Sequence, residues 1–310
     1  MIRHSRPEGR RKKSRSLQTA RQEYCSRISQ IAVKALLYEV CIAPKPGLVD
    51  RLNNGAHQDM DIYTFLDSAC ALSGYFREIT EQGIRLQRVS PEHLLPYLQR
   101  FGVLAEQEMF RATGEVNTHK GIVFSMGILC AAAGHLYGKT RRVSIAELLR
   151  VCGEIAGQAR PAEEREKTAA TNGERLYQKY KIEGVRGEVF REFPSVRLHG
   201  FPAFCRAMKK GWDINSAGVY ALFHIMAHLE DTNLISRSSL ETQMQIQKKL
   251  CEILQDDSLS PQEVLHQAEE MDKEFIRLNI SPGGAADMLS ITLMIWFLQK
   301  ELPEYFGEFD

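Results

Sequence analysis

The stretch MLSITLMIWFL at residues 288–298 decides the fold class, because it is the most apolar run of the chain. A membrane-spanning helix needs about 20 such residues, so this run predicts a buried helix of a globular protein instead. Apolar residues also recur at helical spacing at 28–36, 122–136, 217–229 and 240–254. No segment alternates apolar and polar residues over the length of a strand. The sequence therefore predicts an all-α fold, a single compact multi-helix domain without a sheet.

Capping residues place several helix starts. Ser144 with Glu147, and Ser260 with Glu263, have the spacing of a capping box. Asp61 can cap a further helix, whose end is predicted at a glycine, Gly83.

Residues 158–202 are expected to form an irregular, glycine-rich active-site loop. Glycines and a proline interrupt mixed charge there, which leaves only one short helix expected near 174–180. Long irregular segments in a compact helical protein are usually functional loops or disorder. Arg186 lies among these glycines, and its forked donors suit a phosphate or a carboxylate. A plain surface arginine is the alternative.

Charge and cysteine usage narrow the class of protein. The net charge is +1, from 40 Lys and Arg against 39 Asp and Glu, so we expect neither nucleic acid nor a membrane as a partner. A basic run lies at 10–13, and residues 1–24 are expected to be a disordered tail rather than a targeting arm. The catalytic domain is then expected at 25–303, with a short tail at 304–310. The 7 cysteines include no C-x-x-C pair, which indicates reduced thiols in a cytoplasmic protein.

Charged residues and glycines concentrate in the interhelical loop at residues 45–60. The candidate ligand-binding residues there are Lys45, Gly47, Asp50, Arg51, His57 and Asp59. Such density beside prolines and glycines favours a binding site. An ordinary polar loop is the alternative.

A second junction, NTHKG at 117–121, opens the next helix. The free backbone amides of that helix start, with Thr118 and Lys120, predict an anion cradle. One helix terminus contributes only about 0.3–1 kcal/mol toward a charge, so a triphosphate needs further cations such as Lys45, Arg51 or Mg²⁺. A simple helix cap is the alternative.

Two further junctions carry acidic residues. Gly283 and Gly284 precede Asp287 at a helix start, where backbone can approach a ligand, although a plain turn would look the same. Asp231 follows the apolar helix of His224 and His228, where a carboxylate opposes the helix dipole and a metal would explain it. The two histidines lack the glutamate of a metalloprotease motif, which favours core histidines over zinc ligands.

Six short motifs occur in order along the chain: KPGLVDR at 45–51, GAHQDM at 55–60, VNTHKG at 116–121, GVRGE at 184–188, DTN at 231–233 and SPGGAAD at 281–287. Together they resemble the triphosphoribosyl-dephospho-CoA synthase family, which prepares the prosthetic group of citrate lyase and malonate decarboxylase. The likeness covers roughly residues 30–300. Glu115, Ala285 and the pair at 238–239 depart from the usual residues of the family, but every ionisable motif residue is present.

The resemblance implies that ATP and 3'-dephospho-CoA react to give 2'-(5''-triphosphoribosyl)-3'-dephospho-CoA and adenine. It implies Mg²⁺ as the divalent cation and no organic cofactor. A downstream holo-acyl-carrier-protein synthase and the acyl carrier subunit are the implied partners, and the chain is expected to form a homodimer.

Roles follow for the candidate residues as a hypothesis. Phosphate and nucleotide binding is assigned to Lys45, Gly47, Arg51, Asn117, Thr118, Lys120, Arg186, Gly283 and Gly284. Asp287 is assigned as general base, His57 or His119 as donor, and Asp50, Asp59 and Asp231 to Mg²⁺ or the sugar, with Asp59 also catalytic. Two rival functions stay open: an all-α metal phosphohydrolase using His57, Asp59, His228 and Asp231, and a nucleotide-binding regulator without chemistry.

Overall fold

The computed structural model describes residues 8–139, 142–157, 172–256 and 258–307. In chain order the elements are α1 (Glu8–Cys41), α2 (Ile62–Ala71), α3 (Ser73–Arg85), η1 (Pro91–His93), α4 (Leu95–Ala112), α5 (Lys120–Leu136), α6 (Ile145–Ala156), α7 (Asn172–Tyr180), α8 (Gly184–Phe190), η3 (Ser195–Gly200), α9 (Phe201–Lys209), α10 (Ile214–Met226), α11 (Thr232–Arg237), α12 (Leu240–Leu254), α13 (Pro261–Leu278) and α14 (Gly283–Glu301). In the described part of the chain the only strand-like pairing is one bridge between Val143 and Phe306. The predicted all-α domain is confirmed.

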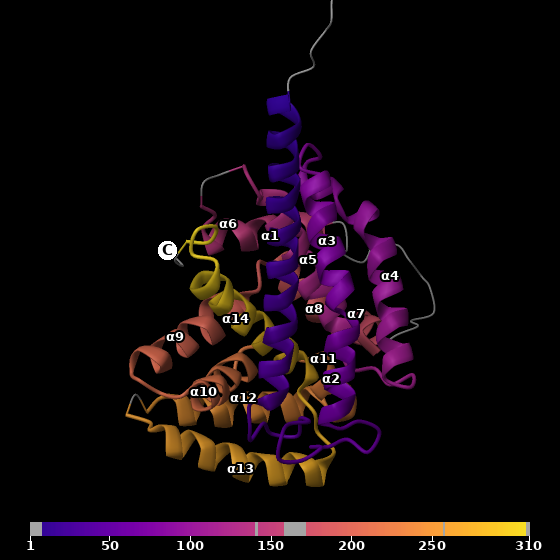
Figure 1. Cartoon of the computed structure of the whole chain (residues 1–310). Helices are drawn as coiled ribbons and strands as arrows, with labels where there is room; N and C mark the ends of the chain where they lie inside the picture. The colour runs from indigo at the N-terminus through magenta and orange to yellow at the C-terminus, as the bar shows by residue number, and fades with distance from the viewer. Residues whose placement is uncertain (1–7, 140–141, 158–171, 257, 308–310) are drawn as a thin grey trace, which may run out of the picture.

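The apolar run at 288–298 lies inside α14, and every residue of it except Trp296 is buried. Helices α5 and α10 are also buried along most of their length, as expected of helices that are apolar all round. Long helix α1 packs along α3 and α14 (Figure 1). None of the helices in the described ranges is both long and apolar enough to cross a membrane.

The predicted helix between Asp61 and Gly83 is two helices, α2 and α3, which meet at Leu72. Asp61 caps α2 in a capping box with Thr64, and Ser260 forms the predicted box with Glu263. Gly83 does not end α3. It lies at the crossing with α5, where a β-carbon would come within 2.1 Å of a backbone oxygen, so glycine serves close packing there.

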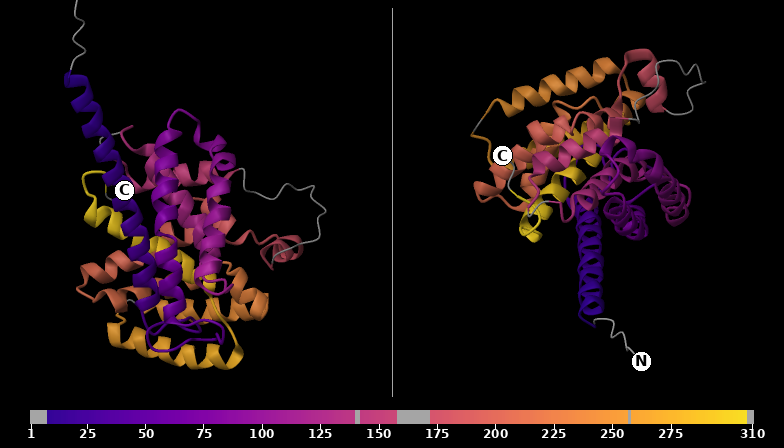
Figure 2. Two further views of the ribbon diagram at one scale, coloured as in Figure 1. Left: turned by 45° about the vertical axis from the view of Figure 1, so that its right-hand side comes forward. Right: turned by 90° about the horizontal axis from the view of Figure 1, so that it is seen from above.

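The ends of the chain differ from expectation. Helix α1 begins at Glu8, within the segment expected to be disordered, and its N-terminal end extends beyond the rest of the molecule in Figure 2. Tyr24 is buried and Arg21 donates to the backbone oxygen of Glu81, so the packed helix starts earlier than residue 25 and propagates through basic residues of good helix propensity. At the other end Phe306 is buried, so residues 304–307 pack on the body instead of forming a tail.

The expected irregular loop is largely helical where it is described. Helices α7 and α8 and the π-helix η3 occupy most of residues 172–200, while residues 158–171 lie outside the described part. Gly184 adopts φ +57 at the start of α8, and Phe193 and Phe201 are buried. Burial of these aromatic side chains outweighs the low helix propensity of the glycines, which the local sequence could not indicate.

Candidate active site

Segments from across the chain line one cleft of about 1870 Å³. This exceeds the roughly 300–1,000 Å³ of a typical small-molecule pocket and gives room for two nucleotide-sized ligands. Lys45, Asp59, Lys120, Asp231 and Asp287 all line it. Helices α4, α5, α7, α8 and α11, which contribute to its walls, lie together on one side of α1 (Figure 1).

Asp287 presents an unpartnered carboxyl group to this cleft. Among the described residues no donor forms a hydrogen bond with it. A β-carbon on Gly121 would lie 2.0 Å from Asp287 Oδ2, so glycine lets this carboxyl group approach the start of α5. Burial first, and then the charges of Asp231 and Glu39, raise the pKa of Asp287 well above its usual value. These features are those of a general base.

Asp231 joins two helix starts at the cleft wall. Its Oδ1 accepts hydrogen bonds from the backbone of Asn233 (2.9 Å) and Leu234 (3.2 Å), and its Oδ2 accepts one from Ala285 (2.9 Å). A β-carbon on Gly284 would lie 2.9 Å from Oδ1, so the close approach requires glycine. The carboxylate therefore caps α11, which explains its place after α10 without a metal. Burial raises its pKa, and these amide bonds oppose the shift.

Lys45 forms a buried ion pair with Glu39, a residue that the sequence analysis missed. Lys45 Nζ donates to the Glu39 carboxylate and, at 2.8 Å, to the Glu39 backbone oxygen. Both residues line the cleft and both are buried. Burial raises the pKa of Glu39, and Lys45 opposes that shift. A lone acidic residue in an otherwise apolar helix end was the available signal.

His119 carries a buried ring nitrogen without a partner. Its Nδ1 lies 2.7 Å from Ser68 Oγ, which itself accepts a hydrogen bond from Thr118 Oγ1 at 2.7 Å. Because Ser68 then donates to Nδ1, the proton of the neutral ring belongs on Nε2, which has no hydrogen-bond partner. Burial first, and then Lys45, lower the pKa of His119 to about 3. His119 therefore carries a neutral, unpartnered N–H donor, buried in the wall of the cleft.

Comparison of the chain with known proteins identifies its family. The family described as CitG, ATP:dephospho-CoA triphosphoribosyl transferase, matches residues 25–305. The chain belongs to this family. It is therefore an enzyme, a pentosyltransferase.

Curated relatives carry related names. The probable 2-(5''-triphosphoribosyl)-3'-dephosphocoenzyme-A synthase of Streptococcus mutans is 37% identical over 293 residues, which is 90% of this chain and 98% of the relative. That of Albidiferax ferrireducens is 39% identical, covering 87% and 89%. The 2-(5''-triphosphoribosyl)-3'-dephosphocoenzyme-A synthase of Pectobacterium atrosepticum is 37% identical, covering 88% and 90%. No solved structure matches the chain.

Not every predicted site residue lies in the cleft. Gly47, Asp50 and Arg51 are absent from its lining. Arg51 is exposed and donates to the backbone oxygen of Cys41 and, at 2.7 Å, to Asn215 Oδ1. It thus satisfies the carbonyl end of α1 rather than a phosphate.

Asp50 and Gly47 shape the loop that carries Lys45. The Asp50 carboxylate accepts backbone hydrogen bonds from Lys45 (2.8 Å) and Leu52 (2.7 Å), so it organises the loop and is not held out toward a metal. Gly47 has φ +68, and a β-carbon there would meet the backbone oxygen of Ile280 at 2.1 Å. A short polar motif indicates a built loop, but not the direction of each side chain.

His57 lines the cleft beside a second missed residue, Arg237. His57 Nε2 is 2.8 Å from Ser281 Oγ, and its Nδ1 is 3.3 Å from Arg237 Nη2 and 3.7 Å from Asp59 Oδ1. Burial first, and then Arg237, lower the pKa of His57. Arg237 lines the cleft and also donates to the backbone oxygen of Ala56 at 3.0 Å. This cation follows the DTN motif by about one helical turn.

The remaining predicted phosphate ligands surround the helix starts. Asn117, Thr118, Lys120, Arg186, Gly283 and Gly284 line the cleft. Lys120 is exposed and 3.4 Å from Glu106, while Asn117 Oδ1 accepts from the Lys120 backbone at 3.3 Å. Asn117 thus stabilises the helix start as well as facing the cleft. Glu188, also at the cleft, accepts a hydrogen bond from Ser195 at 2.7 Å.

No group of three histidine, cysteine or acidic side chains that could hold a metal occurs within the described ranges. Mg²⁺ commonly binds through one or two carboxylates together with substrate phosphates, and the cleft carboxylates suit that mode. His228 stacks on His199 with ring centroids 3.5 Å apart and is not part of the cleft lining. The four residues required by the rival phosphohydrolase therefore do not share this site.

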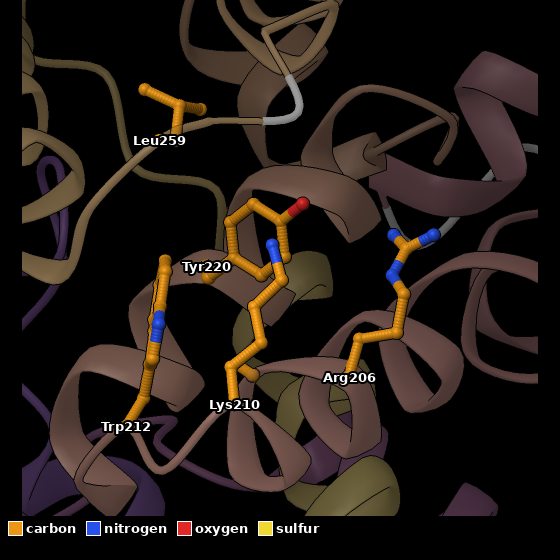
Figure 3. Close-up of a pocket in the computed structure, with 6 residues that line it drawn as sticks. Arg206, Lys210, Trp212, Tyr220 and Leu259 are labelled. Atoms are coloured by element: carbon orange, nitrogen blue, oxygen red, sulfur yellow. The ribbon is translucent and has the colours of Figure 1, made fainter.

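A second hollow lies between α9 and α10 and is lined by Arg206, Lys210, Trp212, Tyr220 and Leu259 (Figure 3). Its volume of about 10 Å³ is only enough for one water molecule. We therefore assign substrate binding to the large cleft.

Proposed function

We propose that the protein transfers the 5-triphosphoribosyl group of ATP to the 2'-hydroxyl of 3'-dephospho-CoA and releases adenine. The product, 2'-(5''-triphosphoribosyl)-3'-dephospho-CoA, is the precursor of the prosthetic group on the acyl carrier subunit of citrate lyase or malonate decarboxylase. The observation that carries this proposal is the unpartnered Asp287 carboxyl group in a cleft wide enough for both substrates.

The chemistry requires a base, because the attacking hydroxyl loses its proton as the ribosyl C–N bond breaks and the new C–O bond forms. Asp287 accepts that proton. Positive charge develops on the sugar, as in glycoside hydrolysis, and the buried carboxylates of Asp231 and Glu39 stabilise it. His119 Nε2–H assists the departing adenine. A single displacement of this kind needs no covalent nucleophile.

The triphosphate is held by cations and helix starts. Arg237 and Arg186 line the cleft and are exposed to it. The first turns of α5 and α14 add backbone amides at Gly121 and Gly283. Asp59 or Asp231 would hold Mg²⁺ beside the phosphates of ATP, and the ion would neutralise part of their charge.

Arg237 gives a test of this placement. We expect Arg237→Ala to raise the KM for ATP about 10- to 100-fold, because it removes a charge-assisted hydrogen bond. Arg237→Lys should keep part of the affinity, because it keeps the positive charge. Arg51→Ala is the matched control, because Arg51 is also an exposed arginine with side-chain hydrogen bonds but lies outside the cleft lining. Steady-state kinetics with each substrate varied measure both. Equal KM values for the two alanine variants would contradict the placement.

The reaction itself is tested by incubating the purified protein with ATP, Mg²⁺ and 3'-dephospho-CoA and measuring adenine by chromatography. We expect adenine and the triphosphoribosylated product in equal amounts, both dependent on dephospho-CoA. A phosphohydrolase would release phosphate instead, and a regulator would bind ATP without product.

We further propose that the enzyme acts in the cytoplasm as a homodimer and passes its product to a holo-acyl-carrier-protein synthase. The seven free cysteines support a reducing compartment. Analytical ultracentrifugation tests the dimer.

A further inference from the structure

Beyond the carboxyl groups of Glu39, Asp231 and Asp287, the cleft extends into a part with mainly apolar walls, between α3, α4 and α5. We call this part the apolar arm, lined by Tyr75, Leu95, Leu98, Gly102, Val103 and Phe124. Glu106 and Gln99 also line the cleft here, and Glu106 is paired with Lys120. The apolar arm therefore joins the polar site at Lys120.

The walls of the apolar arm leave space at Gly102. Tyr75 Oη donates to the backbone oxygen of Val123 at 2.8 Å and lies against Gly127, where a β-carbon would come within 2.0 Å of it. Tyr75 therefore packs against α5 and forms part of the wall of the apolar arm. A β-carbon on Gly102 would instead find its nearest neighbours at 3.9 and 4.0 Å, in ordinary contact. Val103 is 56% exposed, so apolar surface remains uncovered.

The length of the apolar arm argues for a chain-like occupant. Leu95 precedes Glu106 on α4 by a distance of about 16 Å along the helix axis. Adenine of the donor is bonded to the reacting sugar carbon, so in the proposed reaction it must lie near Asp287. This adenine cannot reach the far end of the apolar arm. The triphosphate of ATP is too highly charged to enter the apolar arm.

We propose that the apolar arm binds the pantetheine chain of the dephospho-CoA acceptor, an inference that rests on the proposed function. Pantetheine is the one long, uncharged part of the two substrates. In dephospho-CoA a diphosphate precedes this chain, and Lys120 supplies a cation where the apolar arm joins the polar site. The acceptor ribose is thereby directed toward Asp287.

Gly102→Leu tests this assignment, because it fills the apolar arm and replaces a helix glycine by a better helix former. We expect the KM for dephospho-CoA to rise about tenfold or more, with the KM for ATP unchanged. Gly74→Leu is the matched control and should resemble the wild type, since Gly74 is an exposed helix glycine outside the cleft lining, and its β-carbon would meet nothing within 4 Å. Val103→Asp, at an exposed position, places a charge in the apolar arm without disturbing buried side chains and should have the same selective effect.

A truncated acceptor completes the test. ADP is dephospho-CoA without pantetheine, so with ATP saturating we expect wild type and Gly102→Leu to use ADP equally poorly. A rise in the KM for ATP, or an equal loss with ADP and dephospho-CoA, would assign the apolar arm to the donor and overturn the inference. Unchanged KM values in both Gly102→Leu and Val103→Asp would also overturn it. If the wild type releases no adenine with any acceptor, the proposed function fails instead.

Discussion

Replacing Asp287 by asparagine is expected to lower turnover about 10²- to 10⁴-fold, the usual contribution of a general base. Asparagine keeps the size of the side chain but cannot accept the proton of the attacking hydroxyl. The dissociation constant for ATP should hardly change, because Asp287 is not assigned to the phosphates. Adenine release in single turnovers and calorimetry with ATP measure the two quantities separately.

Asp67→Asn is the matched control, since Asp67 is exposed on α2 and outside the cleft lining. It should retain wild-type turnover. Full adenine release by Asp287→Asn would exclude Asp287 as the base, and a parallel loss of ATP affinity would assign it to ligand binding instead.

The raised pKa of Asp287 gives this variant a second signature. The pKa of this carboxyl group is higher in the folded protein than in the unfolded chain. The protonated group therefore contributes stability that is fully present below the unfolded pKa. That contribution is lost as pH rises through the folded pKa. Asparagine does not ionise. As pH rises from the unfolded to the folded pKa, the melting temperature of the wild type should therefore fall relative to that of Asp287→Asn. Wild-type turnover should fall as pH drops through the same raised pKa, because the base becomes protonated.

Local signals in the sequence were sufficient for much of the fold. The apolar run at 288–298 and the capping residues Asp61 and Ser260 lead to the observed helices because the responsible contacts lie within a few residues. Residues 184–202 were expected to be irregular because their glycines oppose a helix. Their helices depend on burial against distant segments, which propensity does not contain.

The candidate site was predictable as a set of loops, but not as a set of side chains. Asp287 and Lys45 line the cleft, but the Lys45 ammonium group pairs with Glu39, and Arg51, in the same motif as Lys45, points to the end of α1. Glu39 and Arg237 were missed because each belongs to a helix and approaches the site only through tertiary packing. Helix positions of this kind look like ordinary surface or core residues in one sequence.

Lys45→Met is expected to destabilise the protein by about 3–5 kcal/mol, because it leaves Glu39 buried without its partner. The matched control is Lys249→Met, which breaks the exposed pair with Glu274 and should cost about 1 kcal/mol or less. Chemical denaturation followed by circular dichroism measures both. A similar small loss for the two variants would show that solvent reaches the Lys45 pair.

The double variant Lys45→Met with Glu39→Leu separates folding from catalysis. Replacing a buried ion pair by apolar residues of similar volume is often neutral or stabilising, so stability should return to near the wild-type value. Turnover should not return, because the proposed transition state needs the negative charge of Glu39 near the ribose and Asp287. If the double variant had wild-type turnover, the Lys45–Glu39 pair would serve folding only, because catalysis would then not need the charge of Glu39.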